Sequence, residues 1–204
     1  MPTLLLIRHG DNDFLASQRL PGHLSGIHLN KEGRVQAAQL AQCLSKLSVR
    51  AIYSSPLERA VETAEPLAEA LQMKTTLRSD LTDVDPGDWT GRFIKSLLRS
   101  KLWKVMQENP SRFQFPNGET FAQAQARITM ALDAIVTDHP DGLVAIFFHA
   151  DPIKLAVTHY LGLPLDNFQR LSVNPGSVTV LSIDGSAPRL LAANLIPPFS
   201  FPES

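Results

Sequence analysis

The amino-acid sequence predicts an α/β protein with a mostly parallel sheet, and two observations lead to this prediction. Strand-like apolar runs alternate with helix-like segments along most of the chain, and such an alternation favours a parallel sheet. The runs at 3–7 and 143–148 are strongly apolar rather than alternating in polarity. Strands of that composition are typical of parallel sheets whose two faces are both covered.

The N-terminal half is expected to hold two strand–helix pairs followed by an edge strand. Asn30 suits the N-cap of the first helix, and Pro56 suits the first turn of the second. An acidic, glycine-containing stretch at 80–91 predicts a loop. The expected elements are a strand at 3–7, a loop at 11–30, a helix at 31–47, a strand at 51–55, a helix at 57–71 and a strand at 73–77.

The C-terminal half continues the alternation and closes with two strands. The segment 92–118 is richer in polar and aromatic residues than its flanks, and we expect it to form a small lid. A turn at Asp184-Gly185 is predicted between the last two strands. The expected elements are a helix at 92–106, a loop at 109–118, a helix at 119–137, a strand at 143–148, a helix at 153–161 and strands at 177–183 and 189–195.

Length and composition predict one soluble domain over residues 1–204. With 44% hydrophobic residues, the chain can bury a sizeable core. Its 19 Lys and Arg residues against 20 Asp and Glu residues give a formal net charge of −1, which argues against a general nucleic-acid or anionic-membrane binder. Cys43 is the single cysteine, so neither a disulfide framework nor a thiolate zinc site is expected. With no signal-peptide pattern or membrane span in the sequence, a cytoplasmic location is the expectation.

Chemically active side chains follow three strand-like segments. Arg8 and His9 end the first strand, Arg59 lies just after the second, and His149 ends the strand at 143–148. Parallel strands bring these ends to one edge of the sheet, where ligands usually bind. One guanidinium group can donate two parallel hydrogen bonds to phosphate oxygens, and helix N-termini add positive electrostatic potential. The sequence therefore predicts a phosphate pocket.

A histidine in such a pocket suggests phosphoryl transfer. A neutral imidazole is a competent nucleophile at phosphorus, so it can accept a phosphoryl group and later release it. The departing alkoxide then needs a proton from a nearby acid. The acidic loop between Asp80 and Asp88 supplies candidates.

Several blocks of the sequence, taken in order, resemble the histidine phosphatase superfamily in its phosphoglycerate mutase-like branch. The blocks are Arg8-His9-Gly10, Arg19-Leu20-Pro21-Gly22, Leu29-Asn30-Lys31-Glu32-Gly33-Arg34-Val35-Gln36-Ala37, Tyr53-Ser54-Ser55-Pro56-Leu57-Glu58-Arg59-Ala60-Val61-Glu62-Thr63-Ala64, Gly87-Asp88-Trp89-Thr90-Gly91, Phe115-Pro116-Asn117-Gly118-Glu119-Thr120 and His149. The resemblance implies a doubly wound, three-layer α/β/α fold. It makes His9 the phosphorylated nucleophile, places Arg8, Arg59 and His149 around the phosphoryl group, and makes Asp83 the proton donor.

The sequence departs from the family pattern at two places. The donor of this branch is usually glutamate, and Asp83 is one methylene shorter, so Asp85 and Asp151 stay open as alternatives. The pattern usually has a hydroxyl residue where Asn12 stands and an asparagine where Leu15 stands. We expect Asn12 or a backbone amide to bind the phosphate instead, because amides also donate to phosphate oxygens.

Three functions are compatible with these residues. Hydrolysis of a small phosphorylated metabolite is the first expectation, because the middle segment is compact, whereas the resemblance implies a longer and more basic one in true mutases. Phosphoryl transfer within a sugar acid and a catalytically silent phospho-ligand sensor are the alternatives. No metal site or cofactor is expected, since the remaining histidines show no ligand spacing. A homodimer stays open, because exposed strand edges often pair in such folds.

Overall fold

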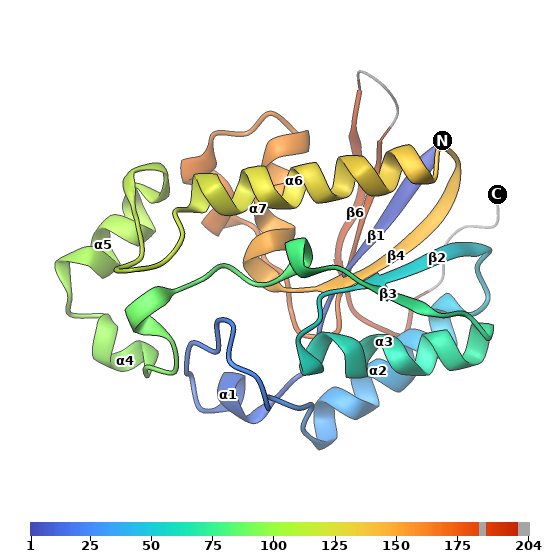
Figure 1. Ribbon diagram of the computed structural model, residues 1–204, viewed down its shortest axis with the longest axis horizontal. Helices are drawn as coiled ribbons and strands as arrows, with labels where there is room; N and C mark the ends of the chain where they lie inside the picture. Colours follow the sequence, from blue (N-terminus) through green and yellow to red (C-terminus); the bar gives the residue numbers. More distant parts are fainter. Residues whose placement is uncertain (184–186, 200–204) are drawn as a thin grey trace.

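The computed structural model describes residues 1–183 and 187–199 and contains a six-stranded sheet with the order β3-β2-β4-β1-β5-β6 (Figure 1). Strands β1, β2, β3 and β4 are mutually parallel, whereas β5 runs antiparallel to both of its neighbours. The predicted mostly parallel sheet is confirmed. The strands are β1 (Pro2–Arg8), β2 (Val49–Ser54), β3 (Thr75–Leu77), β4 (Gly142–Phe148), β5 (Val178–Ser182) and β6 (Arg189–Leu195).

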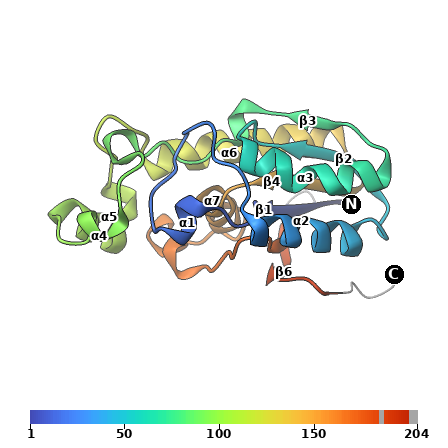
Figure 2. The same ribbon diagram turned by 90° about the horizontal axis from the view of Figure 1, so that it is seen from below.

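Helices cover both faces of the sheet, which gives three layers (Figure 1 and Figure 2). Helices α2 (Lys31–Leu44) and α3 (Glu58–Leu71) lie on one face. Helices α6 (Phe121–Asp138) and α7 (Ala150–Tyr160) lie on the other. This arrangement confirms the doubly wound α/β/α fold.

Strand β1 lies inside the sheet and contributes to both hydrophobic cores. Leu4 and Leu6 pack with α6 and α7, whereas Leu5 and Ile7 pack with α2 and α3, and all four side chains are fully buried. Burying one such side chain contributes about 1.5–3 kcal/mol to folding. The apolar run therefore anchors the end of β1, where the predicted nucleophile follows.

The predicted lid differs from its expected secondary structure. The single helix predicted at 92–106 is two helices, α4 (Ile94–Leu97) and α5 (Lys101–Glu108). Between them, the Ser100 side chain accepts a hydrogen bond from the backbone N–H of Trp103 and so starts a new helix. In Figure 1 this segment projects from the end of the sheet that also carries α1.

An aromatic cluster joins the segment 92–118 to the body of the protein. Trp89, Phe113 and Phe115 are nearly fully buried and contact one another. Phe121 of α6 extends the cluster towards α7, and Trp103 stacks on Trp89. These aromatic side chains are core residues, so they fix the base of the segment.

Other elements also differ from the sequence-based expectation. Helix α1 (Asp13–Ala16) lies in the predicted loop. Helix α7 begins at Ala150, three residues before the predicted start, with Pro152 in its first turn, where no N–H is needed. Short 3-10 helices are formed by Ser79–Leu81, Gly87–Trp89, Pro110–Arg112 and Leu165–Arg170.

The remaining expectations concern membranes, the cysteine and one turn. Within the described ranges, no helix combines the length and apolar character needed to cross a membrane. Cys43 is half-buried on α2. The predicted turn at Asp184-Gly185 lies outside the described residues.

Candidate active site

Three parallel strands end at the same edge of the sheet and bring polar side chains together there. His9 follows β1, Ser55 follows β2 and His149 follows β4. The backbone N–H of His9 donates to Phe148 O at 3.0 Å, and that of Ser55 donates to Phe147 O at 2.9 Å. The hydrogen-bond ladder of the sheet thus continues into the site and holds these residues in place.

His9 is held in the form that a nucleophile needs. Its ring Nδ1 donates to the Gly10 carbonyl at 2.7 Å; because a carbonyl only accepts, Nδ1 carries the proton and Nε2 presents its lone pair. The side chain is buried, and burial together with the charges of Arg59 and Arg8 holds the pKa of His9 well below its usual value. The imidazole is therefore neutral at neutral pH.

Arg59 is fully buried in the first turn of α3 and lies beside Asp83. Its Nη2 donates to the Gly22 carbonyl at 2.8 Å, whereas its Nε and Nη1 have no hydrogen-bond partner among the described residues. Thr63 fixes this turn, since its hydroxyl donates to Arg59 O at 2.6 Å and accepts from Gly10 N at 2.9 Å. Buried guanidinium donors of this kind are strong ligands for an oxyanion.

Arg8 and Asn12 add further donors. Arg8 donates through Nη1 to Val173 O at 2.7 Å, and its buried Nε has no partner in the described ranges. Asn12 is fully buried, and its Oδ1 caps α1 by accepting from Leu15 N at 3.0 Å. The Asn12 amide nitrogen is left without a partner in the part of the chain that is described, so it can donate to a phosphate oxygen.

His149 lies beside His9, with the ring centroids 5.3 Å apart. Its Nε2 shares a hydrogen bond of 2.9 Å with the Ser55 hydroxyl. Burial, then the charge of Arg59, holds the pKa of His149 well below its usual value. Sequence reasoning missed Ser55 as the partner of His149, although the Ser54-Ser55-Pro56 strand end was a usable signal.

Asp83 lies opposite these groups on the loop after β3. Its Oδ2 is 3.5 Å from Arg59 Nη2 and 3.7 Å from His149 Nδ1, and its Oδ1 accepts from Val84 N at 2.9 Å. Burial raises the pKa of the Asp83 carboxyl above its usual value, although the Arg59 charge opposes this. A raised pKa favours the protonated form that a proton donor requires.

The two alternative acids lie in different surroundings. Asp85 accepts from Gly87 N at 2.9 Å and so holds a turn of its own loop. Asp151 pairs with Lys154 at 3.1 Å within the first turns of α7. Of the three carboxyls, the structure brings that of Asp83 against Arg59 and His149.

The remaining histidines have other partners. His28 pairs with Glu62, and His139 Nε2 lies 2.9 Å from the Tyr53 hydroxyl. His23 donates from Nε2 to the backbone carbonyl of Asp83 at 2.6 Å, a contact that sequence reasoning did not predict. In the described part of the chain, no group of three or more His, Cys, Asp or Glu side chains could hold a metal ion.

Comparison with known families agrees with this geometry. The sequence model of the histidine phosphatase superfamily (branch 1) matches residues 4–196. The chain belongs to this superfamily. The Arg8-His9-Gly10 end of β1, Arg59 and His149 lie within the matched range.

Relatives and solved structures include several phosphatases. Phosphoserine phosphatase 1 of Hydrogenobacter thermophilus is 27% identical over 197 residues, which cover 96% of this chain and 93% of that protein. Phosphoglycerate mutase-like protein 4 of Arabidopsis thaliana is 30% identical over 156 residues, covering 74% of this chain and 67% of that protein. The structure of mycobacterial glucosyl-3-phosphoglycerate phosphatase with VO3 is 26% identical, with a TM-score of 0.86 and coverage of 94% and 98%. This chain is a histidine phosphatase, and the superfamily together with these phosphatase relatives supports hydrolysis of phosphomonoesters.

Proposed function

We propose that this histidine phosphatase removes the phosphoryl group from a small phosphorylated metabolite through a phosphohistidine on His9. The observation that carries the proposal is a set of buried side-chain nitrogens, on residues at or after the ends of the parallel strands, that have no hydrogen-bond partner among the described residues. The atoms are Arg8 Nε, Asn12 Nδ2, Arg59 Nε and Nη1, and His149 Nδ1. Unmet buried donors are costly in a folded protein, and a phosphate group with several acceptor oxygens would satisfy them together.

The proposed reaction uses the side chains of His9 and Asp83. His9 Nε2 attacks phosphorus as the ester P–O bond breaks, and the Asp83 carboxyl gives its proton to the departing alcohol oxygen. A water molecule next attacks the phosphohistidine, the P–N bond breaks, and the Asp83 carboxylate takes a proton from that water. Inorganic phosphate, neutral His9 and protonated Asp83 result.

The positive surroundings supply the electrostatic part of catalysis. Arg8 and Arg59 stabilise the negative charge that builds on the phosphoryl oxygens. Helix α7 begins at Ala150 beside His149 without a side-chain cap among the described residues, so its first N–H groups can also face an anion. Since the donors are fixed before substrate arrives, little reorganisation is needed during reaction.

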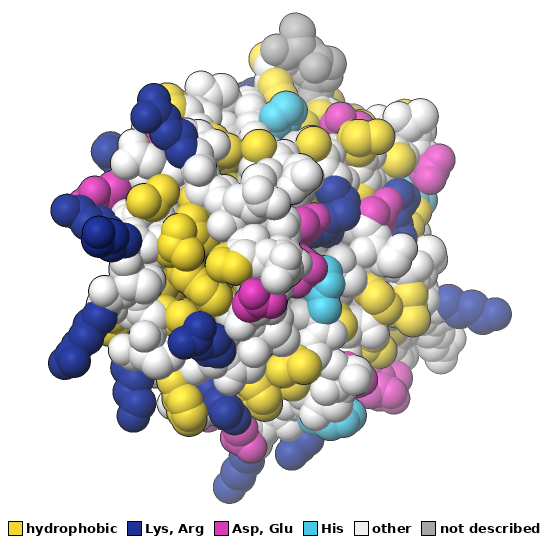
Figure 3. Space-filling model, turned by 60° about the vertical axis from the view of Figure 1, so that its left-hand side comes forward, with side chains coloured by type: hydrophobic (Ala, Val, Ile, Leu, Met, Phe, Trp, Pro, Cys, Tyr) yellow, Lys and Arg dark blue, Asp and Glu magenta, His cyan; other side chains and the backbone are white. Residues whose placement is uncertain are grey.

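The segment 92–118 is proposed as the lid that selects the substrate. It contains six Lys and Arg residues and one acidic residue, Glu108. Figure 3, which turns this side of the molecule forward, shows basic side chains projecting around exposed hydrophobic ones. Leu98, Leu102 and Val105 are exposed on or beside α5, so the segment can contact both charged and apolar parts of a substrate.

A panel of phosphorylated metabolites, scored by released phosphate, tests the function. We expect turnover of 4-nitrophenyl phosphate and of at least one alkyl phosphate, with acid-labile phosphate trapped on His9. The panel includes phosphoserine and 3-phosphoglycerate because relatives are named for phosphoserine and glucosyl-3-phosphoglycerate. Conversion of 3-phosphoglycerate to its isomer without phosphate release would support a mutase instead. Failure to turn over or trap phosphate would support a silent sensor.

Two further points concern cellular location and oligomeric state. The protein is expected to work in the cytoplasm, and whether two copies pair through exposed strand edges stays open. In the described sheet, β3 and β6 are the edge strands. Light scattering, combined with a charged substitution at Leu191 on β6, whose side chain is 57% exposed, tests this pairing.

A further inference from the structure

The backbone around Asp83 is held by hydrogen bonds from an arginine that lies outside the phosphate pocket. Arg127 of α6 donates from Nη1 to the backbone carbonyls of Asp80 at 2.9 Å and Thr82 at 3.0 Å. Its Nη2 donates to the carbonyl of Asp83 itself at 3.2 Å. One half-buried guanidinium thus binds three carbonyls within four residues of the donor loop.

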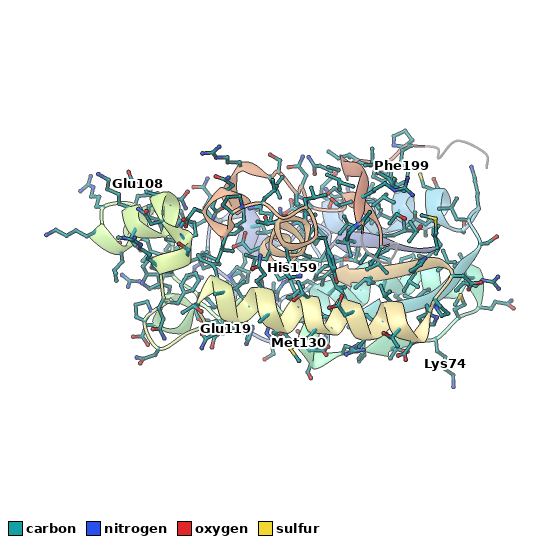
Figure 4. All side chains as sticks on the ribbon, turned by 90° about the horizontal axis from the view of Figure 1, so that it is seen from above. Lys74, Glu108, Glu119, Met130, His159 and Phe199 are labelled. Atoms are coloured by element: carbon teal, nitrogen blue, oxygen red, sulfur yellow. The ribbon has the colours of Figure 1, made fainter. Side chains whose placement is uncertain are left out.

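Glu119, which precedes α6, links Arg127 to the same loop. It receives two hydrogen bonds from Arg127, of 2.9 and 2.8 Å, and its Oε2 also accepts from Asp85 N at 3.0 Å. The backbone N–H of Glu119 in turn donates to Asp85 O at 3.0 Å. In Figure 4, Glu119 lies at the lid end of α6, well separated from Glu108 on α5. The Arg127–Glu119 pair therefore holds the backbone both before and after Asp83.

His23 also holds the backbone of Asp83. His23 Nε2 donates to the Asp83 carbonyl at 2.6 Å, so this one oxygen accepts from both His23 and Arg127. The loop that carries His23 is tied to the base of the lid. Backbone hydrogen bonds run from Leu20 N to Arg92 O and from Ile94 N to Gln18 O.

We propose that Arg127 and His23 are positioning residues that set the distance of the Asp83 carboxyl from the leaving oxygen of the substrate. The proposal rests on the function proposed above. The Asp83 side chain has one methylene fewer than glutamate, so its carboxyl reaches less far from the main chain. The backbone must therefore hold the carboxyl closer to the leaving oxygen. A misplacement of about 1 Å can cost roughly 100-fold in rate.

The test compares two leaving groups, because a misplaced acid harms substrates with a poor leaving group most. Arg127→Met is expected to lower kcat about 30-fold on the fastest alkyl phosphate of the panel but only about threefold on 4-nitrophenyl phosphate. Arg78→Met is the matched control: Arg78 is also 23% exposed and binds the Asp80 carboxylate, without touching the Asp83 carbonyl. It should lower both rates alike.

His23 offers an independent test because its side chain is exposed and its loss should not unfold the protein. His23→Ala should lower the alkyl phosphate rate about fivefold, and His23→Gln, which keeps an N–H donor, should restore most of it. Equal losses on both substrates, or no rescue by glutamine, would overturn the proposal. Wild-type turnover, trapped phosphohistidine and a leaving-group difference in Asp83→Asn would still uphold the proposed function in that case.

Discussion

The histidines of the site each follow a buried parallel strand, whereas the Asp83 carboxyl comes from an irregular loop. His9 and His149 are 2% and 0% exposed, and the sheet ladder holds their backbones. Asp83 is 19% exposed, and side chains from distant segments hold its backbone through carbonyl contacts. The phosphate side thus depends on the core of the fold, and the acid side depends on a few polar contacts.

This difference assigns different tasks to the two sides. A pocket for phosphate can be the same for every substrate, so a rigid sheet edge suits it. The acid must meet the leaving oxygen of one particular substrate, and its loop is tied both to α6 and, through His23, to the base of the lid. Substitutions should therefore affect all substrates alike on the phosphate side and selectively on the acid side.

The largest effect is expected from removing the nucleophile. His9→Ala should lower kcat/KM by about 10⁴-fold or more on every substrate, because the proposed nucleophile is lost. Binding of inorganic phosphate should persist, since Arg8 and Arg59 remain. Steady-state kinetics measure kcat/KM, trapping of acid-labile phosphate detects the phosphohistidine, and calorimetry measures phosphate binding. Turnover within tenfold of wild type would remove His9 from its proposed role.

Removing the acid should act selectively. Asp83→Asn should slow phosphohistidine formation by about 10²-fold with an alkyl phosphate, and much less with 4-nitrophenyl phosphate, whose phenolate leaves without a proton. Rapid-quench kinetics follow the step directly. Asp151→Asn is the control, because Asp151 pairs with Lys154 rather than with Arg59. If Asp151→Asn shows the selective loss instead, the donor lies at the start of α7.

The residues of the phosphate side could be predicted from the sequence. Apolar strands with polar residues at their ends, followed by helices, place those ends at one edge, so Arg8, His9, Arg59 and His149 were found together. Asn12 was predicted as a phosphate ligand, and the structure leaves its amide unpartnered among the described residues. Its role as the cap of α1 was missed because a four-residue helix shows no periodicity.

The acid side could be predicted only in part. The family resemblance pointed to Asp83, but its neighbours come from segments far apart in the chain, and nothing local links His23 or Arg127 to that loop. The secondary structure of the lid could also be predicted only in part. Its apolar pattern predicted one helix, but Ser100 caps a new one, because a serine oxygen competes for backbone N–H groups.

The two sides should also respond oppositely to pH. His9 and His149 have lowered pKa values in the folded protein, so the unfolded chain binds more protons below about pH 6.5. The free energy of unfolding should then fall by up to about 1.4 kcal/mol per pH unit for each histidine as pH decreases. The raised pKa of Asp83 acts in the other direction, because the folded state binds the proton more tightly above pH 3.8.

Urea unfolding between pH 7 and pH 5.5, in buffer free of phosphate, measures this slope. In His149→Asn, the free energy of unfolding should depend less steeply on pH, by the equivalent of about one proton. A variant of the exposed His159 is the control. A slope that does not change in His149→Asn would mean that His149 binds its proton equally in the folded and unfolded states.

The smallest effect is expected at Asn12, where two functions can be separated. Asn12→Ala removes both the cap of α1 and the amide that we propose binds phosphate. We expect KM to rise about fivefold, which corresponds to the loss of one hydrogen bond of about 1 kcal/mol. Asn12→Ser keeps an oxygen that can accept from Leu15 N and a hydroxyl that can donate, so it should stay within about twofold of wild type.

Asn12→Asp distinguishes the cap from the phosphate contact. The carboxylate preserves the cap acceptor but replaces the buried amide donor with a negative charge that repels phosphate. Thermal stability should stay close to wild type while KM rises more than in Asn12→Ala. An Asn12→Asp enzyme with unchanged KM would show that the amide faces no substrate oxygen. Phosphate binding would then rest on Arg8, Arg59 and His149.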